Sequence, residues 1–319
     1  MADKPYQNKA KRGKYDEKPK KGRTHLTGPP LTKEFKEQED RNLLELLTKR
    51  KIENSVKLSV QNGSFDSTCY VVFAANYFAK SIKGDVFIPA EISLAEFSLK
   101  TGLLKTYHSL VNPKVLPYGN KYDAQVHCSN THKLPLPPNA LGEENLSKLY
   151  VAIMNFAKNE ATGEYRPLYV KEDSLYIAKA ILAYMKNDFN DSHITLEVYP
   201  IQHLFHIMKE SACKIGELSL PSSLSIQSVF YRDNYAYHVG LSCEYHENID
   251  RSNYCAKSIA SRMCFKFTEY MAPDVAIKII KGRHIPHDVA PSFEVIEPRP
   301  FKPTRKQDKI FKKEKDEED

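Results

Sequence analysis

The sequence lacks any hydrophobic run long enough to cross a membrane. A membrane-spanning helix needs about 18 consecutive apolar residues, and no stretch of the chain approaches that length. The first residues, Met1-Ala-Asp-Lys-Pro5, are polar and carry no apolar segment of the kind that a secretory signal needs. Trp is absent, but hydrophobic residues make up 41% of the chain and aromatic residues 11%. We therefore expect a globular core outside the membrane.

A disulfide framework is also missing. The six cysteines are scattered along the 319 residues without paired spacing, at positions 69, 128, 213, 243, 255 and 264. Such usage is typical of a reducing compartment, where Cys serves metals or packing. No G-x-S-x-G motif is present to support a serine-hydrolase triad. The sequence has no internal repeat.

Charge is concentrated at the N-terminus. Residues 1–30 hold nine Lys and Arg against three acids, a net of +6 (9 − 3). The whole chain is +7 and residues 297–319 contribute +1 (8 − 7), so residues 31–296 are neutral (7 − 6 − 1 = 0). A basic arm of this kind can bind nucleic-acid phosphates, including those of DNA, or act as a nuclear localisation patch.

The chain is expected to have three parts. Residues 1–40 are Lys- and Pro-rich and predict a disordered basic tail, and residues 286–319 predict a disordered charged tail. Between them, residues 41–285 alternate strand and helix patterns, which favours an α/β domain with helices on both faces of the sheet. Strands are expected at 69–73, 90–98, 103–111 and 167–171, and helices at 41–56, 144–158, 174–186, 197–212 and 256–270.

Three residues with metal-ligating side chains are clustered late in the chain. Cys243, His246 and Cys255 follow a C-x2-H-x8-C spacing, with Cys255 at the start of an expected helix. Two thiols and an imidazole suit Zn²⁺, with a fourth position filled by a distant residue or by water. The alternative is three unrelated buried residues, because free Cys is among the most buried residue types.

The first strands resemble those of DEDD-type exonucleases on the RNase H-like fold. The resemblance rests on a strand, then Glu91-Ile-x-x-Ala-Glu-Phe97, a Gly turn, and Tyr107-His-Ser-Leu-Val-Asn-Pro113. In those enzymes the first strand ends in Asp-x-Glu, whose carboxylates hold two Mg²⁺ ions. Here the corresponding run is Phe73-Ala74-Ala75-Asn76, so both acids are missing, and Asp173 alone cannot replace them. The two-metal exonuclease mechanism is therefore not expected.

An RNase H-like frame without these acids, but with the Cys/His cluster, resembles the Maelstrom family of germline small-RNA silencing factors. The matching pieces are Pro89-Ala-Glu91-Ile, the 107–113 segment, and Cys243-x-x-His246-Glu-Asn-x-Asp250 with Cys255. They bracket residues 54–285. The resemblance implies an RNase H-like mixed sheet with flanking helices. It also implies a structural zinc held by Glu91, Cys243, His246 and Cys255.

The resemblance further implies a function in the piRNA pathway. We expect a transposon-silencing factor that binds single-stranded RNA and small-RNA silencing proteins, in perinuclear germ granules of the cytoplasm and in the nucleus. The alternatives are a single-strand-specific endoribonuclease and a protein–protein scaffold without RNA binding. No residue identifies a general base or nucleophile. Many family members carry an HMG box before the domain, where this chain has only the basic arm.

Several further side chains are candidates. Lys257, Arg262 and Lys266 follow Cys255 on the expected helix and can line a groove for RNA phosphates, or simply be solvated. His108 is interpreted as a hydrogen-bonded core residue in preference to an alternative ligand. The remaining candidates are expected to be incidental: His127, Cys128, His132, His203 and His206.

Overall fold

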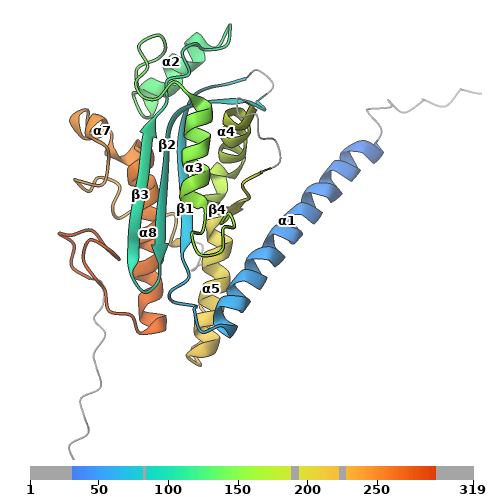
Figure 1. Ribbon diagram of the computed structural model, residues 1–319, viewed down its shortest axis with the longest axis vertical. Coiled ribbons are helices and arrows are strands. Elements are labelled where there is room, and N and C mark those ends of the chain that lie inside the picture. Colours follow the sequence, from blue (N-terminus) through green and yellow to red (C-terminus); the bar gives the residue numbers. More distant parts are fainter. Residues whose placement is uncertain (1–30, 82–83, 188–193, 223–227, 292–319) are drawn as a thin grey trace, which may run out of the picture. The chain divides into compact units, whose positions relative to one another are not determined.

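The computed structural model describes residues 31–81, 84–187, 194–222 and 228–291 (Figure 1). The chain divides into two compact units, Met1–Leu47 and Thr48–Asp319. The second unit contains the five-stranded sheet, with strand order β3-β2-β1-β4-β5. Most of both predicted tails, residues 1–30 and 292–319, lies outside the described residues.

Three antiparallel strands form one half of the sheet. They are β1 (Tyr70–Lys80), β2 (Phe87–Ser98) and β3 (Gly102–Leu110). On the other side of β1, the short strands β4 (Leu168–Val170) and β5 (Val198–Pro200) run parallel to it. A 3-2-1-4-5 order with only β2 reversed is the topology of the RNase H-like fold. The fold class expected from the sequence is therefore confirmed.

Side-chain alternation along the strands separates two apolar layers. On one face, Val71 and Phe73 of β1 pack with α3 (Leu146–Ala157) and α4 (Leu175–Asn187). On the other face, Val72 and Ala74 pack with α5 (Ile201–Ile215) and α8 (Ala256–Met271). Helices thus cover both faces, as predicted. Glu91 of β2 has the same parity as Ala95 and Phe97, so it lies on the α8 face.

Helix α1 (Leu31–Gln61) is longer than the expected 41–56 helix. The apolar set expected from the sequence, Leu43, Leu44, Leu46 and Leu47, is exposed. Contact with the core of the second unit is made instead by Ile52 and Val56, which are fully buried. The four leucines occupy nearly consecutive positions and so point in different directions around the helix. Ile52 and Val56 are four residues apart and therefore lie on the same helix face.

Two elements depart from the predictions. Residues 197–212, expected as one helix, hold β5 and then α5, which begins at Ile201 directly after Pro200. Pro lacks the N–H of a helix interior but is tolerated just before the first turn. Helix α2 (Lys121–Asn130) forms where only a loop was expected. No helix among the described residues is both long and apolar enough to span a membrane.

Candidate metal centre and adjoining cavity

Four potential metal ligands converge at one end of α8. Glu91 comes from β2, and Cys243 and His246 from the start and interior of α7 (Glu244–Asn248), while Cys255 precedes α8 as its N-cap residue. One ligand atom from each lies within 4.8 Å of all the others. Glu91 and His246 are fully buried and so is Cys255. The sequence spacing and the family resemblance named these same four residues.

The separations between the ligand atoms fit the edges of a small tetrahedron. Bond lengths of 2.0–2.3 Å around zinc place neighbouring ligand atoms about 3.3 to 3.8 Å apart. Cys243 Sγ lies 3.1 Å from His246 Nδ1, and Cys255 Sγ lies 3.2 Å from Glu91 Oε1. Glu91 Oε1 is 3.5 Å from His246 Nδ1 and 4.0 Å from Cys243 Sγ. These separations lie on either side of the tetrahedral range, so shifts of a few tenths of an ångström in the side chains would give a four-coordinate zinc site.

The surroundings orient two of the ligands. His246 Nε2 donates to the carbonyl oxygen of His132 at 3.0 Å, which leaves Nδ1 unprotonated toward the sulfurs. Glu91 Oε2 accepts from Asn76 Nδ2 at 2.7 Å and from the backbone N–H of Ala256 at 2.9 Å. Its other oxygen, Oε1, is thereby directed toward the cluster. Such outer contacts are typical of metal sites, because they fix the tautomer and the rotamer of each ligand.

The contact between the two thiols shifts their pKa values in opposite directions. A hydrogen bond from Cys255 to the sulfur of Cys243 lowers the pKa of Cys243, and the same contact raises the pKa of Cys255. A divalent cation would remove this competition, because a metal-bound Cys is deprotonated outright. The donor set is thus suited to a soft or borderline cation.

His108 lies beside the cluster rather than in a separate core position. Its Nε2 is 2.7 Å from Glu91 Oε1. Burial lowers the pKa of His108, but hydrogen bonds to Cys243 and Glu91 more than offset this and raise it to about 9. The prediction of a hydrogen-bonded His is consistent with this contact, and the partner is a member of the cluster itself.

The other histidine candidates lie apart from the four ligand atoms. His127 stacks on Tyr77 with ring centroids 4.2 Å apart, and burial lowers the pKa of His132 to about 4. His132 contributes only its backbone carbonyl to the centre. His203 lies 3.8 Å from Glu53 on α1.

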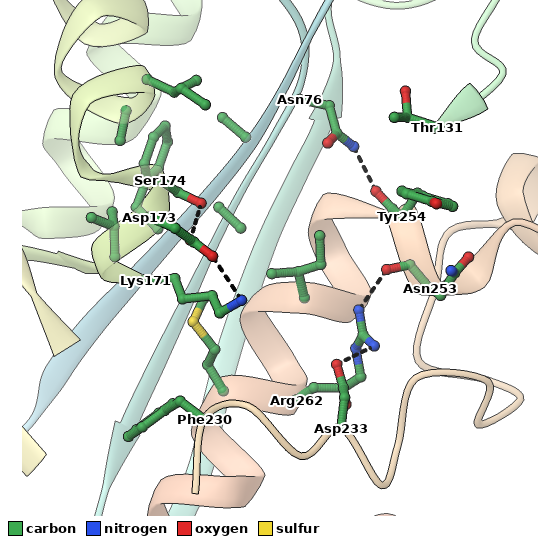
Figure 2. Close-up of a pocket in the computed structure, with 18 of the residues that line it drawn as sticks. Asn76, Thr131, Lys171, Asp173, Ser174, Phe230, Asp233, Asn253, Tyr254 and Arg262 are labelled. Atoms are coloured by element: carbon green, nitrogen blue, oxygen red, sulfur yellow. Dashed lines mark hydrogen bonds and ion pairs between the residues drawn. The ribbon is translucent and has the colours of Figure 1, made fainter. Parts of the chain in front are cut away.

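A cavity of about 450 Å³ opens next to the centre, along the middle of β1 and at the carboxyl end of β4 (Figure 2). Asn76 and Tyr254 line it on the side of the metal centre, and Lys171 and Asp173 line it on the β4 side. Helix α8 contributes Arg262 and Lys266, among others. Figure 2 shows Lys171 and Arg262 reaching into this region from opposite sides.

The three basic residues of α8 do not share one exposed face. Lys257 is half-buried, donates to the Ser242 carbonyl at 3.3 Å and lies outside the cavity. Arg262 and Lys266 are buried and both contact Asp233, at 2.7 and 3.7 Å. The alternative that these residues are simply solvated was therefore wrong for Arg262 and Lys266, because both side chains are buried and line the cavity. Asp233 was not among the residues predicted from the sequence.

The cavity lies beside the segment of β1, residues 73–76, that the sequence resemblance matches to the Asp-x-Glu run of DEDD exonucleases. Asn76 and Asp173 both line it. Within the described ranges, Glu91 and its three partners are the one group of three or more metal-ligating side chains that converges.

Comparison with known proteins places the chain in a family. A family model described as "Maelstrom: piRNA pathway germ-plasm component" matches residues 80–291. The protein named maelstrom 1 of Drosophila persimilis is 34% identical over 300 residues, which is 91% of this chain and 68% of the relative. The protein maelstrom of Drosophila melanogaster is 33% identical over 253 residues, 78% of this chain and 55% of the relative.

A solved structure of E. coli exonuclease I with a dA13 oligonucleotide overlaps 65% of this chain and 41% of that chain, with a TM-score of 0.35 and 10% identity. The assignment of the fold rests on the sheet topology, and that of the family on the sequence matches. The chain belongs to the Maelstrom family of piRNA-pathway proteins.

Proposed function

We propose that this protein acts in piRNA-guided silencing of transposons by binding single-stranded RNA through an RNase H-like domain that a structural zinc ion holds together. The observation that carries the proposal is the convergence of Glu91, Cys243, His246 and Cys255 within 4.8 Å, in a scaffold whose first strand carries Asn76 and no acid. These donors form one closed zinc site beside the cavity, and the Asp-x-Glu acids that help to hold two Mg²⁺ ions in an exonuclease are not present on β1. This favours binding over two-metal hydrolysis.

The zinc would have a structural role. Glu91, Cys243, His246 and Cys255 would fill all four tetrahedral positions, so no water would remain to be activated. When bound, the ion supplies cross-linking: it would tie α7 and the first turn of α8 to β2. The loop between Cys243 and Cys255 holds only short helical turns, so it has little core of its own to fix it.

Two sets of basic residues support RNA binding. Arg262 and Lys266 of α8 face the cavity, and Lys257 lies about one and a half turns before Arg262 on the same helix. The nine Lys and Arg of residues 1–30 would add attraction to any nucleic-acid phosphate, including DNA, without sequence preference. The family description as a germ-plasm component supports a location in perinuclear germ granules. The basic arm would serve as a nuclear localisation patch.

RNA binding by the full-length chain is tested by fluorescence anisotropy with a labelled 20-nucleotide single-stranded RNA and its duplex form. A matched variant replaces the nine Lys and Arg of residues 1–30 with Gln. We expect the variant to bind more weakly and with a shallower salt dependence, but to retain a preference for the single strand.

Affinity that disappears completely with the arm charges would contradict the proposal and favour the protein–protein scaffold. The same samples, incubated with end-labelled RNA and resolved on a gel, report whether the bound strand is cut.

A further inference from the structure

The cavity beside the metal centre has the dimensions of a small-ligand site. Its volume of about 450 Å³ lies within the range of about 300–1,000 Å³ that small-molecule sites occupy. It is built from separate parts of the chain: β1, the segment after β4, residues 230–233, residues 253–254 and α8. A site of this size can enclose one unit of a polymer, while the rest of the polymer lies outside.

Positive charge in the cavity is only partly neutralised. Lys171, Arg262 and Lys266 face two carboxylates, Asp173 and Asp233. Lys171 pairs with Asp173 at 2.9 Å, and Asp233 is shared by the two cations of α8. With every group charged, the five side chains carry a net charge of +1 (3 − 2). Asp233 alone therefore has to neutralise both Arg262 and Lys266.

Lys266 is the least satisfied of the three cations. Its side chain is 9% exposed, and its one ion pair among the described residues is the 3.7 Å contact with Asp233. A buried ammonium group normally has close hydrogen-bonding partners, because burial without them is costly. Burial lowers the pKa of Lys266, and repulsion from Arg262 and Lys171 lowers it further. The ammonium group thus faces the cavity with N–H donors available for a bound anion.

Arg262 also has donors left. Its Nε donates to Ser258, one terminal nitrogen donates to Asp233, and the other donates to the Asn253 carbonyl at 2.7 Å. These contacts use three of its five N–H groups and lock the guanidinium in place. The two remaining N–H groups belong to the terminal nitrogens and suit an anion with several oxygens.

Aromatic rings complete the lining. Phe230, Tyr231 and Tyr254 lie on the side of α8, and Tyr77 with its stacked partner His127 lies on the side of β1. Tyr231 is 79% exposed, which leaves its ring available for stacking. Cations beside an exposed aromatic ring are the combination that binds a nucleotide, the cations holding the phosphate and the ring holding the base. An acidic peptide would use only the cations.

We infer that this cavity is a single-nucleotide site, in which Arg262, Lys266 and Lys171 hold one phosphate of single-stranded RNA and Tyr231 stacks on the attached base. The inference rests on the proposed RNA binding. It adds that the strand is held in this cavity through one of its nucleotides. Protein cations would thus hold a phosphate in the place where the exonucleases hold one with metal ions. Asp233 occupies the cations in the free protein and competes with the phosphate.

Because Asp233 competes with the phosphate, removing its charge should raise nucleotide affinity rather than lower it. Replacing Asp233 with Asn removes a negative charge next to Arg262 and Lys266, so nucleotide affinity should rise about threefold or more. A purely structural ion pair would predict lower thermal stability without any gain in affinity. Lys266→Gln should lower the affinity about tenfold or more, because a charge-assisted contact is lost. Lys214→Gln is the control, because Lys214 is exposed on α5 and lies outside the cavity, and this variant should have no effect.

The test is isothermal titration of the full-length protein and these variants with AMP, with adenosine, and with a decaribonucleotide carrying a 5′-phosphate or a 5′-hydroxyl. The expected result is that AMP binds and adenosine does not, and that either oligonucleotide displaces AMP. Displacement by the 5′-phosphorylated strand alone would place a terminal phosphate in the site, whereas equal displacement would place an internal phosphate there. Both results support the inference.

Three outcomes would overturn it. If the oligonucleotides bind but AMP does not, or if Asp233→Asn leaves AMP affinity unchanged, the single-nucleotide site is wrong while RNA binding stands. If an acidic hexapeptide displaces AMP as well as the RNA does, the cavity is a general anion site. If neither AMP nor RNA binds, the proposed function fails together with the inference.

Discussion

The amide of Asn76 donates to Glu91 Oε2 at 2.7 Å and joins the cavity to the metal centre. The two residues are directly opposite each other on β1 and β2, and both side chains lie on the α8 face. The same amide nitrogen donates to the carbonyl oxygen of Tyr254, at 2.6 Å. An acid at position 76 would repel Glu91 and could not donate to either oxygen. The loss of the exonuclease acid and the presence of the cluster are thus physically linked.

The first prediction concerns this link. Asn76→Ala removes the donor that fixes Glu91, so zinc affinity should fall about 10- to 100-fold. Competition with a chromophoric zinc chelator measures the change. Asn139→Ala is the control, because Asn139 is exposed in a loop. An affinity within twofold of the unsubstituted protein would show that Glu91 needs no such support.

The second prediction concerns removal of the metal. Stripping the ion should lower the melting temperature, because the ligands bind it in the folded state only. At free zinc 100-fold above Kd, binding contributes about 2.7 kcal/mol, or about 5–11 °C for a domain of this size. Hydrogen exchange should accelerate in residues 243–258 and little in β1. Uniform exchange across the whole sheet would contradict a local cross-link.

The third prediction concerns magnesium. Because β1 carries Asn76 and no acid, and Asp173 is the one carboxylate of the segment after β4 that lines the cavity, millimolar Mg²⁺ should not produce stepwise 3′→5′ shortening of labelled RNA. Asp173→Asn is the informative variant. Shortening that requires Mg²⁺ and disappears in this variant would restore the exonuclease mechanism.

The fourth prediction concerns acid stability, away from the metal centre. Arg166 donates to both oxygens of Glu96, at 2.8 and 3.0 Å, and Lys105 lies 3.1 Å away. Burial raises the pKa of Glu96, but these cations more than offset burial and lower it below the usual 4.5. A lowered folded-state pKa contributes stability above the unfolded value, and this contribution is lost as the pH falls through the folded value.

Glu96→Gln should therefore destabilise the protein at pH 7, by about 2–3 kcal/mol for a pair that is mostly buried. The difference should shrink as the pH falls below 4.5. Urea unfolding at pH 7 and pH 3.5 measures it, with Glu160→Gln as the exposed control. A difference that stays constant with pH would mean that Glu96 stabilises the fold by packing alone.

The sequence predicted the elements with long and regular apolar patterns. Strands β2 and β3 and helices α3, α4 and α8 lie close to the expected ranges, because each buries several side chains. Strand β1 begins where expected but runs seven residues beyond Phe73, to Lys80. Strand β5 was missed because three residues are too few for a periodic signal, and Pro200 ends it. Helix α2 buries only Ala124 and Cys128, so it carries almost no amphipathic pattern.

The site was predicted in part. Cys243, His246 and Cys255 are close in sequence and reveal themselves by spacing. Glu91 is more than 150 residues away (243 − 91 = 152) and was named through the family resemblance alone. The roles of Asn76 and Asp233 depend on contacts between distant segments, 178 residues apart for Asn76 and Tyr254 (254 − 76). No local pattern encodes such contacts.

The most direct test of the account is the metal content of the full-length protein by native mass spectrometry. We expect one zinc ion per chain, and none in a folded Glu91→Gln, Cys255→Ser double variant. A folded chain that is purified in the presence of zinc and carries none would contradict the central claim, as would a double variant that still retains the ion.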